Sequence, residues 1–389
     1  MSIDIQKAIE TFRSEYNSEP TVIARAPGRV NIIGEHTDYN HGFVLPMAIE
    51  RETVILARPR NDRKLRAYAA NLERHTDASL EHCERNPHEP WIDYLVGVAH
   101  ELGKLHLPVH GADVVITGDV PVAAGLSSSA SLEMAALVMF EALGEFRLDG
   151  PEAPKLGRRV ENEFLGLSTG IMDQFVVRMA KHNHALYLDC RSLEYEHVPE
   201  QIPMAAFVIA NTGVSRGLSA SKYNERVAEC NEAVRYLRGC HEKGGTHLRD
   251  FAIEDLDHCK KGLPENVFLR ARHVINEIER TKKACHAMRS GDAAELGELM
   301  NLSDESLHTD YEVTCPELVA MTEIARDQEG CYGSRMTGAG FGGSTVSLVA
   351  EAEIERFSKI LLTDYKKRTG MDGEVIISLP AEGAGLVRI

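Results

Sequence analysis

The part of the sequence that most constrains the fold is the stretch PVAAGLSSSAS at residues 121–131. A β-branched run at residues 113–117 precedes it and predicts a strand, whereas residues 132–143 are rich in Ala, Leu, Met and Glu and predict a buried helix. A glycine and three serines therefore lie where a strand passes into a helix. Unpaired backbone N–H groups and the positive end of the helix dipole meet there, which favours a bound anion.

This loop is not a Walker A motif, because no Lys follows its glycine. The charge of a bound polyphosphate would have to be met by amides, hydroxyls, a metal ion and distant basic residues. The alternative interpretation is an ordinary serine cap with flexible neighbours, and the loop alone does not decide between the two.

Composition limits the class of protein. The chain has 389 residues, of which 43% are hydrophobic, so we expect two domains, at residues 1–205 and 206–389. A formal net charge of −16 argues against binding of nucleic acid or of an anionic membrane surface. The eight cysteines include no Cys-x-x-Cys pair, which predicts free thiols rather than disulfides or a zinc site. No signal peptide and no apolar run of about 20 residues is evident, so we expect a cytoplasmic protein.

A second informative stretch, RAPGRVNIIGEHTDYN, covers residues 25–40. Its apolar segment is followed at once by a dense group of hydrogen-bonding side chains. Such a group suits a polyhydroxylated ligand, because each sugar hydroxyl needs both a donor and an acceptor. The alternative is an exposed polar turn. Beyond it, residues 43–49 and 53–58 predict a hairpin, and the polar residues 61–90 predict loops.

A third stretch, SRMTGAGFGG at residues 334–343, formally matches the dinucleotide-binding fingerprint. That fingerprint requires a helix directly after the glycines, whereas residues 344–350 are strand-like. The sequence therefore disfavours a dehydrogenase. It leaves either a glycine-rich loop that a ligand approaches closely or a tight structural turn.

Two carboxylates in the first half are candidates for chemistry. Asp173 lies in the first turn of a helix predicted from Ile171, where the helix dipole would hold it ionised, as a proton acceptor must be. Glu161 lies on a helix predicted over residues 154–165. Both could equally be ordinary structural carboxylates.

Taken together, the three stretches resemble the galactokinase, homoserine kinase, mevalonate kinase and phosphomevalonate kinase superfamily, and within it the galactokinase family. Residues 28–40 are similar to the galactokinase signature, and residues 125–131 to the phosphate loop of the superfamily. Residues 336–343 are similar to its third motif, with Ala339 where galactokinases often carry Gly. Residues 170–174 and 221–224 also resemble galactokinase segments.

The resemblance implies an α+β fold of two domains, with an S5-like N-terminal domain, a ferredoxin-like C-terminal domain and the active site in the cleft between them. It implies transfer of the γ-phosphoryl group of ATP to the anomeric hydroxyl of α-D-galactose, with Mg²⁺ as cofactor. No partner protein is indicated, and we expect a monomer.

The resemblance also assigns roles to residues of this chain. Asp173 would be the base, Arg29 its partner and the stabiliser of the transition state, and Ser129 and Glu161 the Mg²⁺ ligands. The sugar site would comprise Glu35, His36, Thr37, Asp38, Gly170, Asp173 and Tyr223, and the ATP site Ala123, Ala124, Gly125, Leu126, Ser127, Ser128, Ser129, Gly338 and Gly340.

Two other functions compete with this one. Some galactokinase-like proteins are non-catalytic sensors of galactose and ATP, but those lack a Ser-Ala pair in the phosphate loop, and this chain has Ser129 and Ala130. The other is an N-acetylgalactosamine 1-kinase, whose signature resembles a variant with Ile and Cys at the positions of Thr37 and Asn40.

Overall fold

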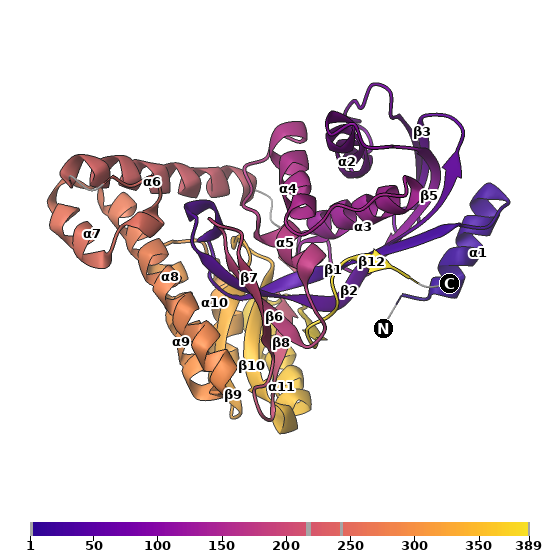
Figure 1. The fold of residues 1–389 in the computed structure, drawn as a ribbon. Coiled ribbons are helices and arrows are strands. Elements are labelled where there is room, and N and C mark those ends of the chain that lie inside the picture. Colours follow the sequence, from indigo (N-terminus) through magenta and orange to yellow (C-terminus); the bar gives the residue numbers. More distant parts are fainter. Residues whose placement is uncertain (1–2, 215–218, 242–243, 388–389) are drawn as a thin grey trace.

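The computed structural model describes residues 3–214, 219–241 and 244–387, which form two β-sheets with accompanying helices (Figure 1). The first sheet has the strand order β12-β1-β2-β5-β3-β4, with β6 joined to β2 and β7 to β6. Its pairs are antiparallel except for β3 with β5. The strands are β1 (Val22–Ile33), β2 (Phe43–Arg60), β3 (Lys64–Ala69), β4 (Arg74–Ser79), β5 (Gly111–Gly118), β6 (His184–Asp189), β7 (Tyr195–Pro199) and β12 (Gly385–Leu386).

The helices of this half are α1 (Ile5–Tyr16), α2 (Ile92–Lys104), α3 (Ser128–Leu143), α4 (Glu152–Arg159) and α5 (Met172–Met179). Helix α3 contacts β1 and β2 and is apolar on nearly all sides, so it is buried along most of its length. With α2 and the inner face of the sheet it forms one large core. This burial fixes the position of the α3 N-terminus, where the serine-rich loop ends.

The second sheet has the antiparallel order β11-β8-β10-β9, built from β8 (Ala205–Asn211), β9 (Cys331–Thr337), β10 (Ser344–Ala350) and β11 (Glu374–Ile377). Its helices are α6 (Ser219–Cys240), α7 (Ile253–Cys259), α8 (Glu265–Ser290), α9 (Ala293–Thr309), α10 (Pro316–Arg326) and α11 (Ile354–Thr369). Strand, helices, two strands, helix and strand follow one another as in a ferredoxin-like unit, with extra helices after β8. Helices α6 and α7 form an arm at one end of the molecule (Figure 1).

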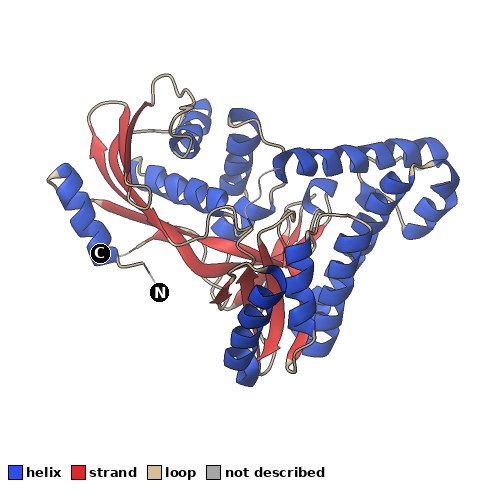
Figure 2. Cartoon of the chain, turned by 180° about the vertical axis from the view of Figure 1, so that it is seen from behind, coloured by secondary structure: helices blue, strands red, loops and turns tan. Residues whose placement is uncertain are grey.

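The long strands β1 and β2 join the two halves. They belong to the first sheet and run on across the middle of the molecule, where Figure 2 shows them as the long strands between the two halves. There Val30 and Leu45 pack in the same apolar cluster as Phe207 and Val346 of the second sheet. Both halves thus share a core beside the residues that follow β1.

Several predicted elements are confirmed. The strand predicted over residues 113–117 lies within β5, the helix predicted over residues 132–143 lies within α3, and the strand-like residues 344–350 are β10. The proposed domain division falls at the start of β8, although β12, far beyond it, pairs with β1 in the first sheet.

Two predictions about the first half are wrong. Residues 43–60 form the single strand β2 instead of a hairpin, because Glu50, Arg51 and Glu52 include no turn-forming residue and pairing with β1 continues past a register shift. Residues 61–90 contain β3 and β4, where a loop was predicted. Leu65 and Ala67 are buried in alternation with exposed polar neighbours, which is a strand pattern that the polar composition obscures.

The prediction that all eight thiols are free is also wrong. Cys240 and Cys259 form a disulfide, because the packing of α6 against α7 brings the ends of these two helices together. The other six cysteines are free. No helix among the described residues has the length and apolar character needed to cross a membrane.

Candidate active site

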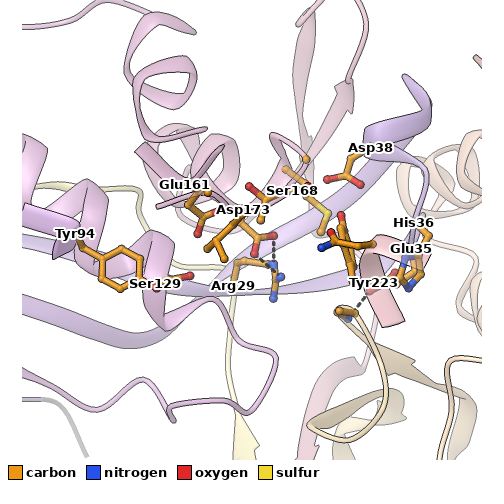
Figure 3. Close-up of a pocket in the computed structure, with 18 residues that line it drawn as sticks. Arg29, Glu35, His36, Asp38, Tyr94, Ser129, Glu161, Ser168, Asp173 and Tyr223 are labelled. Carbon is orange, nitrogen blue, oxygen red and sulfur yellow. Dashed lines mark hydrogen bonds and ion pairs between the residues drawn. The ribbon is translucent and has the colours of Figure 1, made fainter. Parts of the chain in front are cut away.

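A cavity of about 410 Å³ lies where the three sequence stretches meet (Figure 3). It is surrounded by β1 and the residues that follow it, by the α3 N-terminus, by the segment that precedes α5, and by helix α6. Ten residues predicted for the site line it: Arg29, Glu35, His36, Asp38, Ser129, Glu161, Gly170, Asp173, Tyr223 and Gly338. They are drawn from segments separated by up to about three hundred residues, so the cavity exists only in the folded chain.

A two-pronged ion pair joins β1 to the start of α5. Nε and Nη2 of Arg29 donate to Oδ1 and Oδ2 of Asp173 at 2.8 and 2.7 Å, and Nη1 donates to the carbonyl of Gly125 at 2.5 Å. Arg29 is buried, whereas the Asp173 side chain is 31% exposed toward the cavity. The fork geometry holds the carboxylate in one orientation. The guanidinium therefore fixes Asp173 and ties it to the phosphate loop.

The phosphate loop leaves the N-terminus of α3 open. Ser127 is the N-cap residue, but it has φ 58° and makes no side-chain cap hydrogen bond. Its hydroxyl donates instead to Oδ2 of Asp173. Ala123 and Gly125 also have positive φ values, of 59° and 78°. The first N–H groups of α3 are consequently not capped by the side chain that usually serves them, and they remain available to an anion.

Glu161 and Ser129 form a group of oxygen donors beside Asp173. Glu161 belongs to a π-helical turn, Val160–Phe164, and is 5% exposed. Burial raises its pKa, and the Asp173 charge adds to this, while hydrogen bonds involving Thr169, Gln174 and Ser129 act in the opposite direction. A nearby divalent cation would favour the ionised form. One carboxylate and one hydroxyl fit the ligands that Mg²⁺ takes from protein when phosphate and water supply the rest.

Glu35 connects the first stretch to the third. Its carboxylate accepts hydrogen bonds from the backbone N–H of Gly338 at 2.7 Å and from Nδ2 of Asn31 at 2.6 Å. It also forms an ion pair of 2.7 Å with Arg335, which is fully buried. Burial raises the pKa of Glu35, and the Arg335 charge opposes the rise. Glu35 therefore holds the glycine-rich loop against the sugar-signature loop as well as lining the cavity.

A line of hydrogen bonds supports His36. Its Nδ1 lies 2.9 Å from the Tyr39 hydroxyl, which lies 2.6 Å from the Tyr311 hydroxyl, and this in turn is 3.2 Å from Sγ of Cys230. The Nε2 of His36 is buried with no hydrogen-bond partner. Burial, with the nearby His273, lowers the pKa of His36 well below 6.5, so the ring is neutral at pH 7. A neutral ring offers one donor and one acceptor.

Asp38, Gly170 and Tyr223 close another side of the cavity. A Cβ at Gly170 would collide with the Asp38 carboxylate, so a larger residue there would have to displace that carboxylate. Burial raises the pKa of Asp38 to about 6, and the Asp173 charge contributes. Burial also raises the pKa of Tyr223 well above 10. At neutral pH the pair therefore presents an ionised acceptor and a protonated donor.

Comparison with known proteins identifies the family. Residues 10–59 match the galactokinase galactose-binding signature, residues 93–181 the N-terminal domain of GHMP kinases, and residues 283–367 their C-terminal domain. The chain is 42% identical to the galactokinase of Chloroflexus aggregans over 97% of this chain and 96% of that protein. The chain belongs to the galactokinase family. A galactokinase of Fusobacterium nucleatum is 40% identical over 93% of this chain and 94% of its own length.

Solved structures agree with this assignment. The Lactococcus lactis galactokinase, crystallised with galactose, superposes with a TM-score of 0.94 and 35% identity, covering 98% of this chain and 100% of that one. A mevalonate kinase at 19% identity and a TM-score of 0.66 shares the fold. This galactokinase family member is an ATP-dependent sugar kinase with the two-domain α+β fold of its superfamily.

Several residues predicted for the galactokinase site do not line the cavity. The Thr37 hydroxyl donates to the carbonyls of Gly34 and Phe43, so it shapes the signature loop from within. A Cβ at Gly340 would collide with the carbonyl of Val313, so this glycine serves loop packing. The remaining predicted ATP-site residues form the phosphate loop and the start of α3: Ala123, Ala124, Gly125, Leu126, Ser127 and Ser128. Of these, Ala124 and Leu126 are buried in the shared core.

Sequence reasoning missed three residues that support the site. Glu133 of α3 is fully buried and accepts a hydrogen bond from Nε2 of Gln174 at 3.1 Å, beside Glu161. Arg335 neutralises Glu35, and Tyr311 supports His36 through Tyr39. Glu133 follows the phosphate loop in an apolar helix, and a charged residue in such a helix is a signal that could have been used.

Proposed function

We propose that this chain uses Asp173 as the base and Arg29 as its partner to transfer the γ-phosphoryl group of ATP to the anomeric hydroxyl of α-D-galactose. The hydroxyl proton passes to the Asp173 carboxylate, and the oxygen bonds to the γ-phosphorus as the bond to the β–γ bridging oxygen breaks. The products are galactose 1-phosphate and ADP. The observation that carries the proposal is the Arg29–Asp173 fork beside the open N-terminus of α3.

Arg29 has two tasks in this scheme. It holds Asp173 in a single orientation, and its positive charge lies between that carboxylate and the phosphate loop, at the carbonyl of Gly125. Phosphoryl transfer relies mainly on positioning and on neutralising charge spread over the phosphoryl oxygens. The amides at the start of α3 would bind the phosphates of ATP from the other side.

Ser129 and Glu161 would hold Mg²⁺. The ion would neutralise charge on the β- and γ-phosphates of ATP. Glu161 suits this task. Burial and the charge of the nearby Asp173 raise its pKa, so a cation bound beside it would stabilise the ionised carboxylate.

The sugar would lie against Asp38, Tyr223, His36 and Gly170. Asp38 accepts hydrogen bonds from sugar hydroxyls, protonated Tyr223 donates one, and neutral His36 supplies its unpartnered Nε2. This alternation meets the need of each hydroxyl for a donor and an acceptor. Glu35 would act mainly by fixing the loops around the sugar, since its oxygens already accept several hydrogen bonds.

The decisive test is Asp173→Asn, which keeps the shape of the side chain and removes its charge. We expect turnover to fall by about 10²–10⁴-fold, as is typical when a general base is lost, while calorimetry still detects galactose binding. Asp77→Asn, on the exposed strand β4, is the matched control and should leave turnover unchanged. Retention of more than about a tenth of wild-type turnover would exclude Asp173 as the base.

A panel of sugars tests the substrate. The equatorial 4-hydroxyl of glucose would leave a buried polar group unpaired, which can lower kcat/KM by up to about 10⁴–10⁵-fold relative to galactose. Comparable kcat/KM values for galactose and N-acetylgalactosamine would instead support the N-acetylgalactosamine 1-kinase. Galactose binding without any ATP consumption would support the sensor.

We also propose that the protein acts in the cytoplasm as a monomer. ATP is supplied there, and all residues assigned to the reaction come from one chain. Light scattering after gel filtration measures the mass, and a dimer would contradict the proposal.

A further inference from the structure

A group of metal-ligating side chains lies in the α6–α7 arm, away from the cavity. Sγ of Cys240, Sγ of Cys259 and a ring nitrogen of His241 all lie within 4.8 Å of one another, although the two sulfurs are joined as a disulfide in this structure. Within the part of the chain that the structure describes, this is the one group of three His, Cys, Asp or Glu side chains so arranged.

The histidine is held as metal-ligating histidines are. Nε2 of His241 lies 2.9 Å from the backbone carbonyl of Asp255, which can only accept, so Nε2 carries the hydrogen and donates it. Nδ1 of the neutral ring then keeps its lone pair. A ligating histidine almost always donates its other N–H to a carbonyl or carboxylate in this way, because the contact fixes the tautomer and the ring orientation. This hydrogen bond is an observation independent of the proximity of the sulfurs.

We propose that Cys240, His241 and Cys259 bind a soft divalent transition-metal ion, with Zn²⁺ as the expected ion, when the disulfide is reduced. A thiol or dithiol reductant supplies two electrons and two protons to the S–S bond and is itself oxidised to a disulfide. Metal binding then displaces the two thiol protons into solvent, because thiolates are the ligands.

The donor set determines the class of ion. Two thiolates and one imidazole select Zn²⁺ or its softer neighbours over Mg²⁺ and Ca²⁺, which take oxygen ligands. Two thiolates also neutralise a divalent ion, which suits a site where Cys259 is buried and His241 is only partly exposed. The fourth position of a tetrahedral site falls to water.

The full-length protein tests the proposal after reduction with a phosphine under inert gas. Titration with Co²⁺ should produce a thiolate-to-cobalt charge-transfer band that saturates at one ion per chain and disappears when Zn²⁺ is added. The count of thiols that react with a disulfide reagent should fall by two with Zn²⁺ bound. Zn²⁺ should also raise the melting temperature of the reduced protein, since binding stabilises the folded state.

Variants separate this site from adventitious binding. Cys240→Ser, at an exposed position, should abolish the charge-transfer band, and Cys259→Ser should do the same. His241→Asn should weaken Zn²⁺ binding at least about tenfold. The control Cys315→Ser removes a free thiol elsewhere and should bind like the wild type.

Three results would overturn the proposal. They are the absence of the band in the reduced wild type, its persistence in Cys240→Ser, and Zn²⁺ affinity that His241→Asn leaves unchanged. Each is independent of phosphoryl transfer, because no residue of the cavity is altered.

Discussion

The buried ion pair between Arg335 and Glu35 gives the sharpest prediction about stability. Its atoms are 2.7 Å apart and neither side chain is more than 1% exposed. Arg335→Met keeps an unbranched side chain but leaves the Glu35 carboxylate without its cation. Removing one partner of a buried pair costs about 3–5 kcal/mol. Native proteins have only about 5–15 kcal/mol of unfolding free energy, so the loss is a large part of the total.

The loss should depend on pH with a definite sign. Burial already raises the pKa of Glu35, and removing the Arg335 charge that opposes it raises the pKa further. Between the unfolded value of about 4.3 and the raised folded value, the folded variant binds more protons than the unfolded chain. The stability of the variant therefore falls as pH rises through that interval, and its deficit is smallest below the unfolded pKa.

Urea unfolding followed by circular dichroism at several pH values measures the effect. The double variant Glu35→Gln/Arg335→Met should be more stable than Arg335→Met alone, because it leaves no uncompensated buried charge and glutamine still offers an oxygen to the N–H of Gly338. Arg13→Met, which breaks an exposed pair with Glu19, is the control and should change little. A loss below about 1 kcal/mol for Arg335→Met, or one independent of pH, would refute the reasoning.

Three further predictions follow from the same structure. Ser129→Ala and Glu161→Ala should each raise the Mg²⁺ concentration for half-maximal activity, Glu161→Ala more because it removes charge, and unchanged titrations would remove both from the metal site. His41 stacks on His247 with ring centroids 3.5 Å apart, and burial with the His247 charge lowers its pKa to about 4, so unfolding free energy should fall as pH drops from 6.5 toward 4. His41→Phe should flatten that dependence, and an unaltered pH curve would contradict the assignment. Tyr311→Phe should raise KM for galactose up to about tenfold with a smaller change in kcat, since it removes the hydroxyl that contacts both Tyr39 and Cys230 behind His36; a fall confined to kcat would count against this.

The sequence predicts local elements well where the residues of a segment indicate burial and the residues at its ends indicate turns. Strand β10 matches its predicted range, because β-branched and apolar residues predominate between Gly343 and Glu351. The hairpin predicted over β2 fails because pairing with β1, a tertiary property, carries the strand through Glu50–Glu52. Three charged residues at those positions give no local sign of a continuous strand.

The sequence likewise predicts some features of the candidate site and not others. The motifs predict which residues gather at the cavity, including Arg29, Glu161 and Asp173. They do not predict that Ser127 bonds to Asp173 rather than capping α3, because side-chain direction in a left-handed residue depends on the folded loop. Nor do they predict Tyr311, which reaches Tyr39 from 272 positions further along the chain.

The pairing of β12 with β1 has a consequence for synthesis of the protein. Ala24 and Arg25 of β1 are partnered by Leu386 and Gly385, and Ala381 donates to the carbonyl of Ala48. Residues 380–387 leave the ribosome only after the whole second sheet has been made. Until then the nascent chain exposes an edge of β1 whose N–H and C=O groups can pair with a neighbouring chain. Completion of the first sheet therefore waits until this segment has been translated, and we expect a message cut short before it to yield a product prone to aggregate.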